Sequence, residues 1–523
     1  MSAPPAEPGR PPRLAPRPPR LARRLPVALG LGAVTGLGFA PVGLWPAAIL
    51  GLAGFFVLVR GGRPRQAAGL GYAFGVGLFG WTITWSGLMG WYVAAVFIAA
   101  MAVWMLLVGL GAHLVARLPG WPVWVACLWS GYEWAAARVP FGGFNWIRLA
   151  YTTPDQPLSG YLHVLGAPGT SWLVALCAAL IVLPRGTRPG VRLAALGAVV
   201  AVFVGGIVLL TRPVAPGGDT VAVGMVQGNV DETASPTSMG RPHSVTANHL
   251  SESVLLLANA RTGLEPAPDF LLWPENSTDY DPTTDATTTA LVRLAVEAAG
   301  VPILIGTVME GPGPDQRQTS SLWWDPAKGV TARYDKRNLV PFGEYLPLRS
   351  VMLKLFPETA LVGAQSVAGT RPGVLAVTLP DGRALGVGDM ICYELTYDAT
   401  AYDTVRHGAQ ILLVQSSNVT FTGTFQPPQQ FQITRVRAME LQREIVVATT
   451  ATYSGLIDAK GRVLDRTAES TAAFGVYEVP VRDTVSWGVR IGPWFEGVAA
   501  VLGVLAFLAG LARPPRRFES GPH

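Results

Sequence analysis

Long apolar runs separated by short polar segments fill most of residues 25–212. Their pattern predicts helices over residues 25–41, 44–59, 66–90, 92–116, 121–137, 170–184 and 192–211, with one more over 491–511. A helix needs about 20 mostly apolar residues to cross a bilayer, and these runs approach that length. A buried core in a soluble protein would not explain so many runs with so few acidic residues. We therefore expect a polytopic membrane base of about eight spans, with seven in residues 25–212 and the last in 489–512.

The pattern changes after Arg212, where short β-rich runs begin to alternate with helical ones. Strands are predicted at 220–227, 269–274, 301–308, 319–324, 385–393, 410–416 and 445–451, and helices at 246–261, 286–299, 398–407 and 428–443. Continuous Val, Ile and Leu runs of this length are typical of buried strands. Residues 213–488 are therefore expected to form an α/β domain, whose functional residues should gather where strands end.

Three further segments lie outside these patterns. The Pro-rich residues 1–24 are expected to form a disordered cytoplasmic arm, and residues 513–523 a cytoplasmic tail. The basic and then apolar start resembles a signal peptide, but no convincing cleavage site follows Phe39, so we expect a retained helix. Residues 139–169 carry Gly, Pro and aromatic residues. They are either an ordinary connection with interfacial aromatics or a partly embedded loop at the mouth of a lipid-facing cavity.

The net charge of +6 would by itself suggest a nucleic acid partner. Residues 1–212, however, hold sixteen Arg, no Lys and three acidic residues, whereas residues 213–488 hold twenty basic and twenty-nine acidic ones. Only 14% of the chain is charged, against about 25% in a soluble protein. The positive charge thus belongs to the apolar part, and we expect no nucleic acid partner.

The arginines of the apolar part gather at one set of helix ends. They precede the first helix and follow the second, fourth, sixth and last ones. Only Arg138, Arg148 and Arg212 of the first sixteen fall on the other side. Positive charge marks the cytoplasmic side of short loops. Both termini are therefore expected in the cytoplasm, with the α/β domain on the opposite face of the membrane.

Three strand ends carry residues with catalytic chemistry. Glu275 lies in a WPE segment, Lys336 in a YDKR segment and Cys392 in an MICYE segment. A thiolate can attack a carbonyl carbon, a carboxylate can move the proton, and an ammonium with backbone N–H groups can hold the oxyanion. These three residues together predict an acyl-transfer site.

The usage of lysine and cysteine supports this selection. The chain has thirty-six Arg but four Lys, so Lys336 beside Arg337 indicates a need for a compact cation, which can stabilise an oxyanion and lower a thiol pKa. Cys127 and Cys177 lie in predicted spans as core residues, which leaves Cys392 alone in the α/β domain. None of the six His stands in a ligand spacing, so we expect no metal, no cofactor and no Cys–His pair.

The order WPE, YDKRNLVPFGEYLP and ICYE resembles the nitrilase superfamily, which has a Glu-Lys-Cys triad and an αββα sandwich. The long PFGE form after the lysine and the flanking apolar helices resemble the bacterial apolipoprotein N-acyltransferases. The resemblance covers nearly the whole chain. It includes VQGN from Val226, SSN from Ser416, RAME from Arg437 and SGLID from Ser454, the last as the final core strand.

This resemblance implies a two-step reaction without a cofactor. Cys392 would take an acyl chain from a phospholipid as a thioester, and the N-terminal amine of a diacylglyceryl-modified apolipoprotein would accept it. Glu275 would act as general base and acid, and Lys336 would stabilise the oxyanion. A multi-pass monomer in the bacterial inner membrane, with a periplasmic catalytic domain, is also implied. Supporting residues would be Glu344, Tyr393 and Glu394, and substrate-binding residues Trp146, Trp273, Phe342, Asn418 and Phe421.

Residues 417–423 depart from the family pattern. Members often read SNDAWFG there, whereas this chain reads SNVTFTG, with Val419 for the Asp and Phe421 for the Trp. The acyl-donor preference therefore stays open. Two other functions are alternatives: a membrane-anchored nitrilase-type amidase that hydrolyses a small amide, and a transporter. The transporter is disfavoured because Glu133 is the only acid that we place within the spans.

Overall fold

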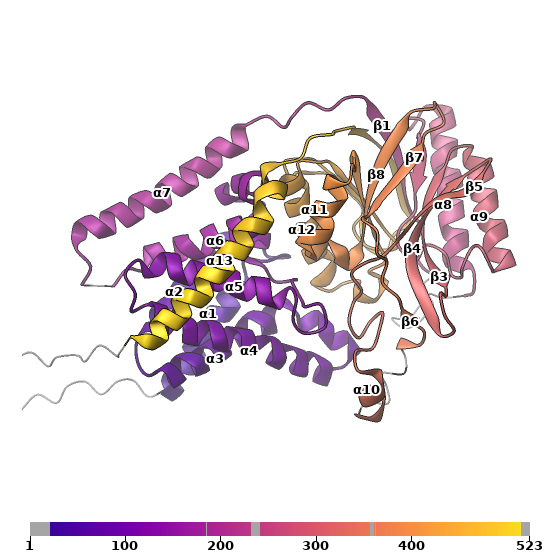
Figure 1. Cartoon of the computed structure of the whole chain (residues 1–523). Helices are drawn as coiled ribbons and strands as arrows, with labels where there is room; N and C mark the ends of the chain where they lie inside the picture. Colours follow the sequence, from indigo (N-terminus) through magenta and orange to yellow (C-terminus); the bar gives the residue numbers. More distant parts are fainter. Residues whose placement is uncertain (1–20, 185, 232–240, 356–359, 361, 514–523) are drawn as a thin grey trace, which may run out of the picture.

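The computed structural model describes residues 21–184, 186–231, 241–355, 360 and 362–513. A helical base and an α/β domain lie side by side, and the last helix returns to the base (Figure 1). The first 20 residues of the expected arm and the tail from residue 514 lie outside the described residues. Leu21–Arg24 already belong to the first helix.

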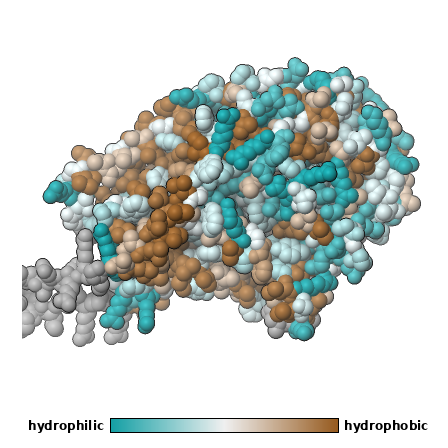
Figure 2. All heavy atoms as spheres, in the orientation of Figure 1, coloured by the Kyte–Doolittle hydropathy of each residue, from teal (hydrophilic) through white to brown (hydrophobic). Residues whose placement is uncertain are grey.

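The helices of the base follow the apolar runs of the sequence. They are α1 Leu21–Gly36, α2 Trp45–Arg60, α3 Pro64–Thr82, α4 Trp91–Val115, α5 Trp121–Ala136, α6 Leu162–Ile181, α7 Pro189–Thr211 and α13 Trp487–Ala512. The predicted run 66–90 is divided, because a 3₁₀ helix, η1 (Thr84–Met89), follows α3. By length and composition, four segments of the described chain can cross a membrane: α4, α6 with the turn before it, α7 and α13. Apolar side chains gather over this base and hydrophilic ones over the α/β domain (Figure 2).

Helix α6 begins eight residues earlier than its predicted start, because Gly and Pro break it without ending it. Gly166 has φ 70° and ψ 178°, and Pro168 follows. The break frees the N–H of Ala167, which donates to Oε1 of Glu440 in α12 (2.5 Å). A carboxylate from the α/β domain therefore satisfies the backbone of a base helix at its kink.

The α/β domain contains two facing sheets. The first has the order β13-β1-β2-β3-β4-β5, with the short β6 on β4, and the second has the order β12-β11-β10-β9-β8-β7. The first-sheet strands are β1 Thr220–Gln227, β2 Phe270–Leu272, β3 Ile303–Glu310, β4 Gln316–Asp325, β5 Gly329–Asp335, β6 Gln365–Ser366 and β13 Ala473–Pro480. The second-sheet strands are β7 Val374–Thr378, β8 Ala384–Ile391, β9 Ile411–Ser416, β10 Ile445–Thr449, β11 Gly455–Ile457 and β12 Val463–Arg466.

Helices cover both outer faces, which gives the expected αββα sandwich. Helices α8 (Ser244–Thr262) and α9 (Ala286–Ala299) pack on the first sheet, while α11 (Asp398–Arg406) and α12 (Gln426–Leu441) pack on the second. A short α10 (Arg349–Leu355) projects from the domain (Figure 1). Helices α11 and α12 share one hydrophobic cluster with the base helices. The second sheet therefore faces the membrane base through a single helical layer.

Several strands escaped the sequence pattern. Strand β12 is exposed throughout and β7 is buried at alternate positions, so neither forms a continuous apolar run. The SGLID segment contains β11, but it does not supply the final core strand as expected. Strand β13 follows it and pairs antiparallel with all of β1. Half-exposed edge strands lack the apolar continuity on which the prediction relied.

Residues 139–169 pack between the base and the domain. Their short helices are η2 (Leu149–Thr152) and η3 (Pro157–Tyr161). The Asn145 amide donates to the carbonyl of Thr396 (3.1 Å), and the Trp146 indole donates to Oε1 of Gln429 (2.7 Å). Both side chains are buried. From Gly143 onward the segment is thus a largely buried junction, and Trp146 is no interfacial anchor.

Candidate active site

Cys392 stands where β8 ends and the short helix η5 (Cys392–Thr396) begins. Its φ is +54°, a conformation that non-glycine residues rarely adopt and that functional sites tend to hold. The turn brings Sγ within 3.9 Å of Oδ1 of Asn418, which follows β9. Cys127 and Cys177 are buried in α5 and α6, as predicted, so Cys392 is the partly exposed thiol among the described residues.

Glu275 lies in the loop after β2 and is nearly buried. Its Oε1 faces the Lys336 ammonium at 3.0 Å, and its Oε2 accepts from the backbone N–H of Ser417 at 3.0 Å. Gly306 lies directly beneath, where a Cβ would come within 2.3 Å of the Pro274 carbonyl oxygen. The absence of a side chain there lets the loop rest on β3, and this holds the carboxylate in place.

Lys336 extends from the end of β5 between two carboxylates. Its Nζ lies 3.0 Å from Oε1 of Glu275 and 3.0 Å from Oε1 of Glu344. The second oxygen of Glu344 accepts from the N–H of Val340 (2.6 Å), which ties the PFGE loop to the lysine. Burial alone would lower the pKa of Lys336, but the two carboxylates and Cys392 outweigh it and raise that pKa well above its ordinary value. The ammonium is therefore a permanent cation of the site.

The surroundings of Cys392 favour its protonated thiol. Burial raises its pKa above the ordinary value, Glu275 raises it further, and Lys336 opposes both. We had expected the lysine to lower the thiol pKa. Lys336 does lower the thiol pKa, but burial and the carboxylates of Glu275 and Glu344 together raise it by more. A thiol of this kind needs an adjacent base before it can attack, and Glu275 is the carboxylate positioned for that task.

Glu394 connects the cysteine turn with the lysine strand. One carboxylate oxygen accepts from the backbone N–H of Arg337 (2.7 Å), and the other from that of Ile391 (2.9 Å). The Tyr334 hydroxyl donates to the same group at 2.8 Å. Because Ile391 precedes Cys392 and Arg337 follows Lys336, one buried carboxylate sets the spacing of both catalytic segments.

Aromatic rings from the base lie over the cysteine turn. Tyr393 stacks on Phe144 and Trp146 with centroids 6.3 and 6.1 Å apart, and its hydroxyl donates to the carbonyl of Gly143. Trp85, in η1, lies 5.7 Å from Trp146. The predicted residues Tyr393 and Trp146 are thus brought together beside Cys392.

The altered loop after β9 reaches the same rings. Phe421 meets Trp85 edge-on at 5.3 Å. Gln429 of α12 accepts from the indoles of both Trp85 and Trp146 and donates to the carbonyl of Thr82 (2.8 Å). Trp85 and Gln429 were not predicted, because an aromatic residue in an apolar run and a Gln in a helix carry no motif.

Two other predicted substrate-binding residues differ in their surroundings. Trp273 is fully buried in the cluster between the first sheet and α8, where its indole donates to Ser253 (2.9 Å). Its predicted substrate contact is therefore corrected, since the side chain belongs to the hydrophobic core. Phe342 is 45% exposed, with φ +64°, and its ring lies against Phe141 at 6.1 Å. It sits on the PFGE loop at the outer edge of the site.

Both parts of the chain are similar to known proteins. Residues 31–180 match the family model described as apolipoprotein N-acyltransferase N-terminal domain, and residues 257–488 match the one described as carbon-nitrogen hydrolase. An apolipoprotein N-acyltransferase of Mycolicibacterium smegmatis is 33% identical over 93% of this chain and 85% of its own. The chain belongs to the apolipoprotein N-acyltransferase family.

Other similar proteins include a second family member and a solved amidase. The apolipoprotein N-acyltransferase of Methylococcus capsulatus is 28% identical over 95% of this chain and 97% of its own. Among solved structures, an amidase of Nesterenkonia from the nitrilase superfamily is 15% identical, with a TM-score of 0.36, over 53% of this chain and 96% of its own. The two matching family models fall on the helical base and on the α/β domain, respectively.

In this acyltransferase, a buried ionic cluster joins the helical base to the α/β domain. It was not predicted from the sequence. Arg148 is fully buried and contacts Glu133 in α5 (2.9 Å), Asp398 in α11 (2.5 Å) and Glu496 in α13. Arg437 holds the other oxygen of Asp398 at 2.7 Å. Burial opposes ionisation of Asp398, but the two guanidinium groups outweigh it and lower its pKa to about 2. The expectation that Glu133 is the only acid in the spans was wrong, because Glu496 lies in α13.

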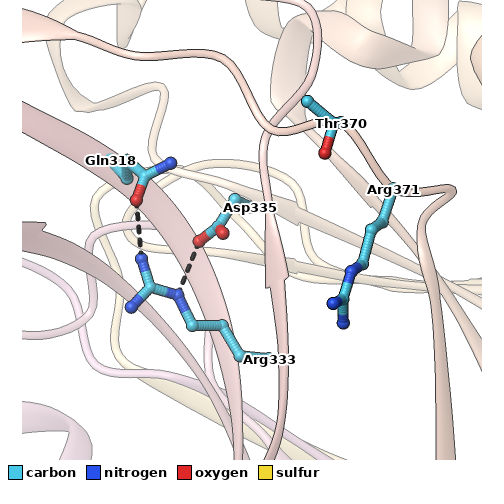
Figure 3. A pocket seen from close by; sticks show the side chains of 5 residues that line it. All are labelled: Gln318, Arg333, Asp335, Thr370 and Arg371. Carbon is cyan, nitrogen blue, oxygen red and sulfur yellow. Dashed lines mark hydrogen bonds and ion pairs between the residues drawn. The ribbon is translucent and has the colours of Figure 1, made fainter. Parts of the chain in front are cut away.

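A polar cavity of about 410 Å³ opens beside β5, the strand that precedes Lys336 (Figure 3). It is lined by Gln318, Arg333, Asp335, Thr370 and Arg371, and the Arg333 guanidinium donates to both Gln318 and Asp335. Successive side chains along a strand point to opposite faces. The cavity therefore lies on the face of β5 away from Lys336 and is separate from the triad. The described residues contain no group of three His, Cys, Asp or Glu that could hold a metal.

Proposed function

We propose that the protein transfers an acyl chain from a membrane phospholipid, through a thioester on Cys392, to the N-terminal amine of a diacylated apolipoprotein. One observation carries the proposal. Lys336 stands between Glu275 and Glu344 beside Cys392, under aromatic rings that come from the apolar base. Such a site combines acyl-transfer chemistry with apolar surroundings that come from the helical base. Membership of the apolipoprotein N-acyltransferase family supports the same reaction.

The first step forms the thioester. Glu275 takes the proton of the Cys392 thiol, and Sγ attacks the ester carbonyl carbon of the lipid. Among the described residues Lys336 donates to two carboxylates, so its third N–H is available for the oxyanion. When the intermediate collapses, the carbon–oxygen bond breaks and Glu275 returns the proton to the leaving lysophospholipid hydroxyl.

The second step uses the same residues in reverse. The lipoprotein amine attacks the thioester carbon while Glu275 accepts a proton from nitrogen. The carbon–sulfur bond then breaks, an amide forms, and the proton returns to Cys392. Because water would compete with the amine, the aromatic cover of Trp146 and Tyr393 protects the thioester by excluding solvent.

The same proposal places the protein in the bacterial inner membrane as a monomer, with its catalytic domain on the periplasmic side. The arginine-rich helix ends support this orientation. Helix α13 ends away from the α/β domain (Figure 1). The Arg513 guanidinium at that end donates to the carbonyl of Arg117, which follows α4.

The experiment traps the intermediate. The purified protein is mixed with labelled phospholipid in detergent micelles, and the hydroxylamine-sensitive label on the protein is measured before and after addition of a diacylated lipopeptide. Wild type should form a thioester that the lipopeptide discharges, and Cys392→Ala should form none. Cys177→Ala, which changes a buried cysteine of α6, is the matched control and should behave as wild type.

The amidase alternative predicts different results from the same preparation. Release of ammonia from short amides without any lipid-derived thioester would favour hydrolysis and refute the transfer. Label that remains on Cys392→Ala would show that the cysteine is not the nucleophile.

A further inference from the structure

A chain of buried side chains runs behind the triad from one sheet to the other. Asp389 of β8, Ser321 of β4 and Gln415 of β9 are all fully buried. Ser321 Oγ contacts the Asp389 carboxyl and lies 2.5 Å from Oε1 of Gln415. The Gln415 amide nitrogen donates to the carbonyl oxygen of Trp273. The chain of contacts therefore links β8 with the loop of Glu275. Asp389 precedes Cys392 by three residues, and Trp273 precedes Glu275 by two.

The hydrogens of this chain can be counted. The carbonyl oxygen of Trp273 can only accept, so the Gln415 nitrogen must face it, and Oε1 must then face Ser321 as an acceptor. Ser321 has one hydroxyl hydrogen, which this acceptor takes. The contact between Ser321 and Asp389 then requires a hydrogen from Asp389. A carboxylate at Asp389 would leave two acceptors competing for a single hydrogen.

The surroundings of Asp389 agree with this count. Its Oδ1 is buried and has no hydrogen-bond partner in the described part of the chain. Burial raises the pKa of Asp389 to about 8, and the Glu394 and Glu275 carboxylates act in the same direction. The Tyr334 hydroxyl of β5, which donates to Glu394, is near enough for its own pKa to be raised by Asp389. A neutral acid is the form that such an environment stabilises.

We propose that Asp389 is a protonated positioning residue, whose hydrogen orders the Ser321–Gln415–Trp273 chain and so fixes Glu275 relative to Cys392. The inference rests on the proposed function for its kinetic test. When Asp389 loses its proton, Ser321 turns its hydrogen to the new carboxylate and Gln415 loses its donor. The Trp273–Pro274 peptide then loses its fixed position, and Glu275 moves out of register with the thiol. The rate of acyl transfer therefore falls as pH rises through about 8, whereas KM for the lipid stays nearly constant.

The test compares pH profiles of kcat and KM for full-length variants in phospholipid micelles. Asp389→Asn keeps a donor toward Ser321 but cannot titrate, so it should retain most of the activity and lose the alkaline decline. Asp389→Leu has no donor, and its kcat should fall about tenfold at neutral pH. Asp381→Asn, the same change at an exposed carboxyl, should keep the wild-type profile. An alkaline decline that persists in Asp389→Asn, or full activity in Asp389→Leu, would overturn the inference.

A second measurement needs no acyl transfer, and its wild-type profile alone can refute the inference if a variant fails to fold. The rate of Cys392 alkylation by iodoacetamide is followed against pH in wild type and Asp389→Asn. A wild-type inflection near pH 8 that is absent in the variant supports the role of Asp389 even if no thioester ever forms. A wild-type profile without such an inflection refutes it. Absence of the thioester with the inflection present would sink only the proposed function.

Discussion

Replacement of Arg148 by Met tests how the base and the α/β domain are held together. The three guanidinium nitrogens reach three different carboxylates, those of Glu133, Asp398 and Glu496. Methionine has comparable length but no charge and no donor. The substitution therefore leaves three buried acids around an apolar side chain, with Arg437 still beside Asp398.

The magnitude follows from the burial of each partner. Removal of one partner from a buried ion pair costs about 3–5 kcal/mol, because the remaining charge has no compensation. Arg138 offers a matched control, since it pairs with the same Glu496 at 3.2 Å but its side chain is 46% exposed. An exposed pair contributes about 0–1 kcal/mol. Arg148→Met should therefore destabilise the protein several times more than Arg138→Met.

The assay is an unfolding titration in mixed micelles of sodium dodecyl sulfate and dodecylmaltoside, followed by tryptophan fluorescence. Arg148→Lys should fall between wild type and Arg148→Met, because a single ammonium cannot reach three carboxylates in different directions. Equal unfolding midpoints for Arg148→Met and wild type would refute the reasoning. So would equal losses for Arg148→Met and Arg138→Met.

Four further outcomes are expected. Lys336→Arg should reduce the rate of thioester formation by at least about a hundredfold, because a planar guanidinium cannot replace the point donor between two carboxylates; formation at the wild-type rate would contradict this. Glu394→Gln should lower kcat and leave KM nearly unchanged in steady-state kinetics, since weaker acceptance from Arg337 and Ile391 costs about 1–3 kcal/mol, and an unchanged kcat would remove its positioning role. Asp389→Asn should be more stable than wild type by an amount that grows with pH between about 4 and 8. The folded wild type holds a proton there that the unfolded chain has released, which lowers its stability by about 1.4 kcal/mol per pH unit; parallel pH profiles of melting temperature would argue against it. Gly166→Ala should destabilise by about 1–3 kcal/mol, because φ is 70° and the new Cβ would lie 2.8 Å from the Tyr402 hydroxyl, whereas Gly197→Ala, in open space on α7, should melt like wild type.

Much of the fold could be predicted because the long elements carry one dominant pattern. The apolar runs predicted the helices of the base, and the Val, Ile and Leu runs predicted β1, β3, β8, β9 and β10. The edge strands escaped, since one face of each meets solvent and their runs are broken. Helix α6 began later in the prediction than in the structure, because its break at Gly166 is satisfied by Glu440, far along the chain.

The candidate triad could also be predicted, because each residue follows a recognisable strand and belongs to a short motif. The motifs had already given the order of these residues along the chain, and the structure adds the contacts of Lys336 with Glu275 and Glu344. Trp273 shows the limit of this reasoning. A position two residues before Glu275 suggests proximity to substrate, yet Trp273 shares the face of Leu271 and packs in the core against α8. Strand β2 ends at Leu272, so strand alternation does not carry on to Glu275.

The sequence by itself determined the chemical class of the site and the division into an apolar base and an acidic domain, since both depend on residue types and their local order. Only the tertiary structure decided which charges meet. Arg148 contacts Glu133, Asp398 and Glu496 of three separate helices, and Asp389 is linked to Trp273 through Ser321 and Gln415 across two sheets. The protonation of a buried acid depends on every donor and acceptor around it. These neighbours come from distant parts of the chain, so no local pattern could have named them.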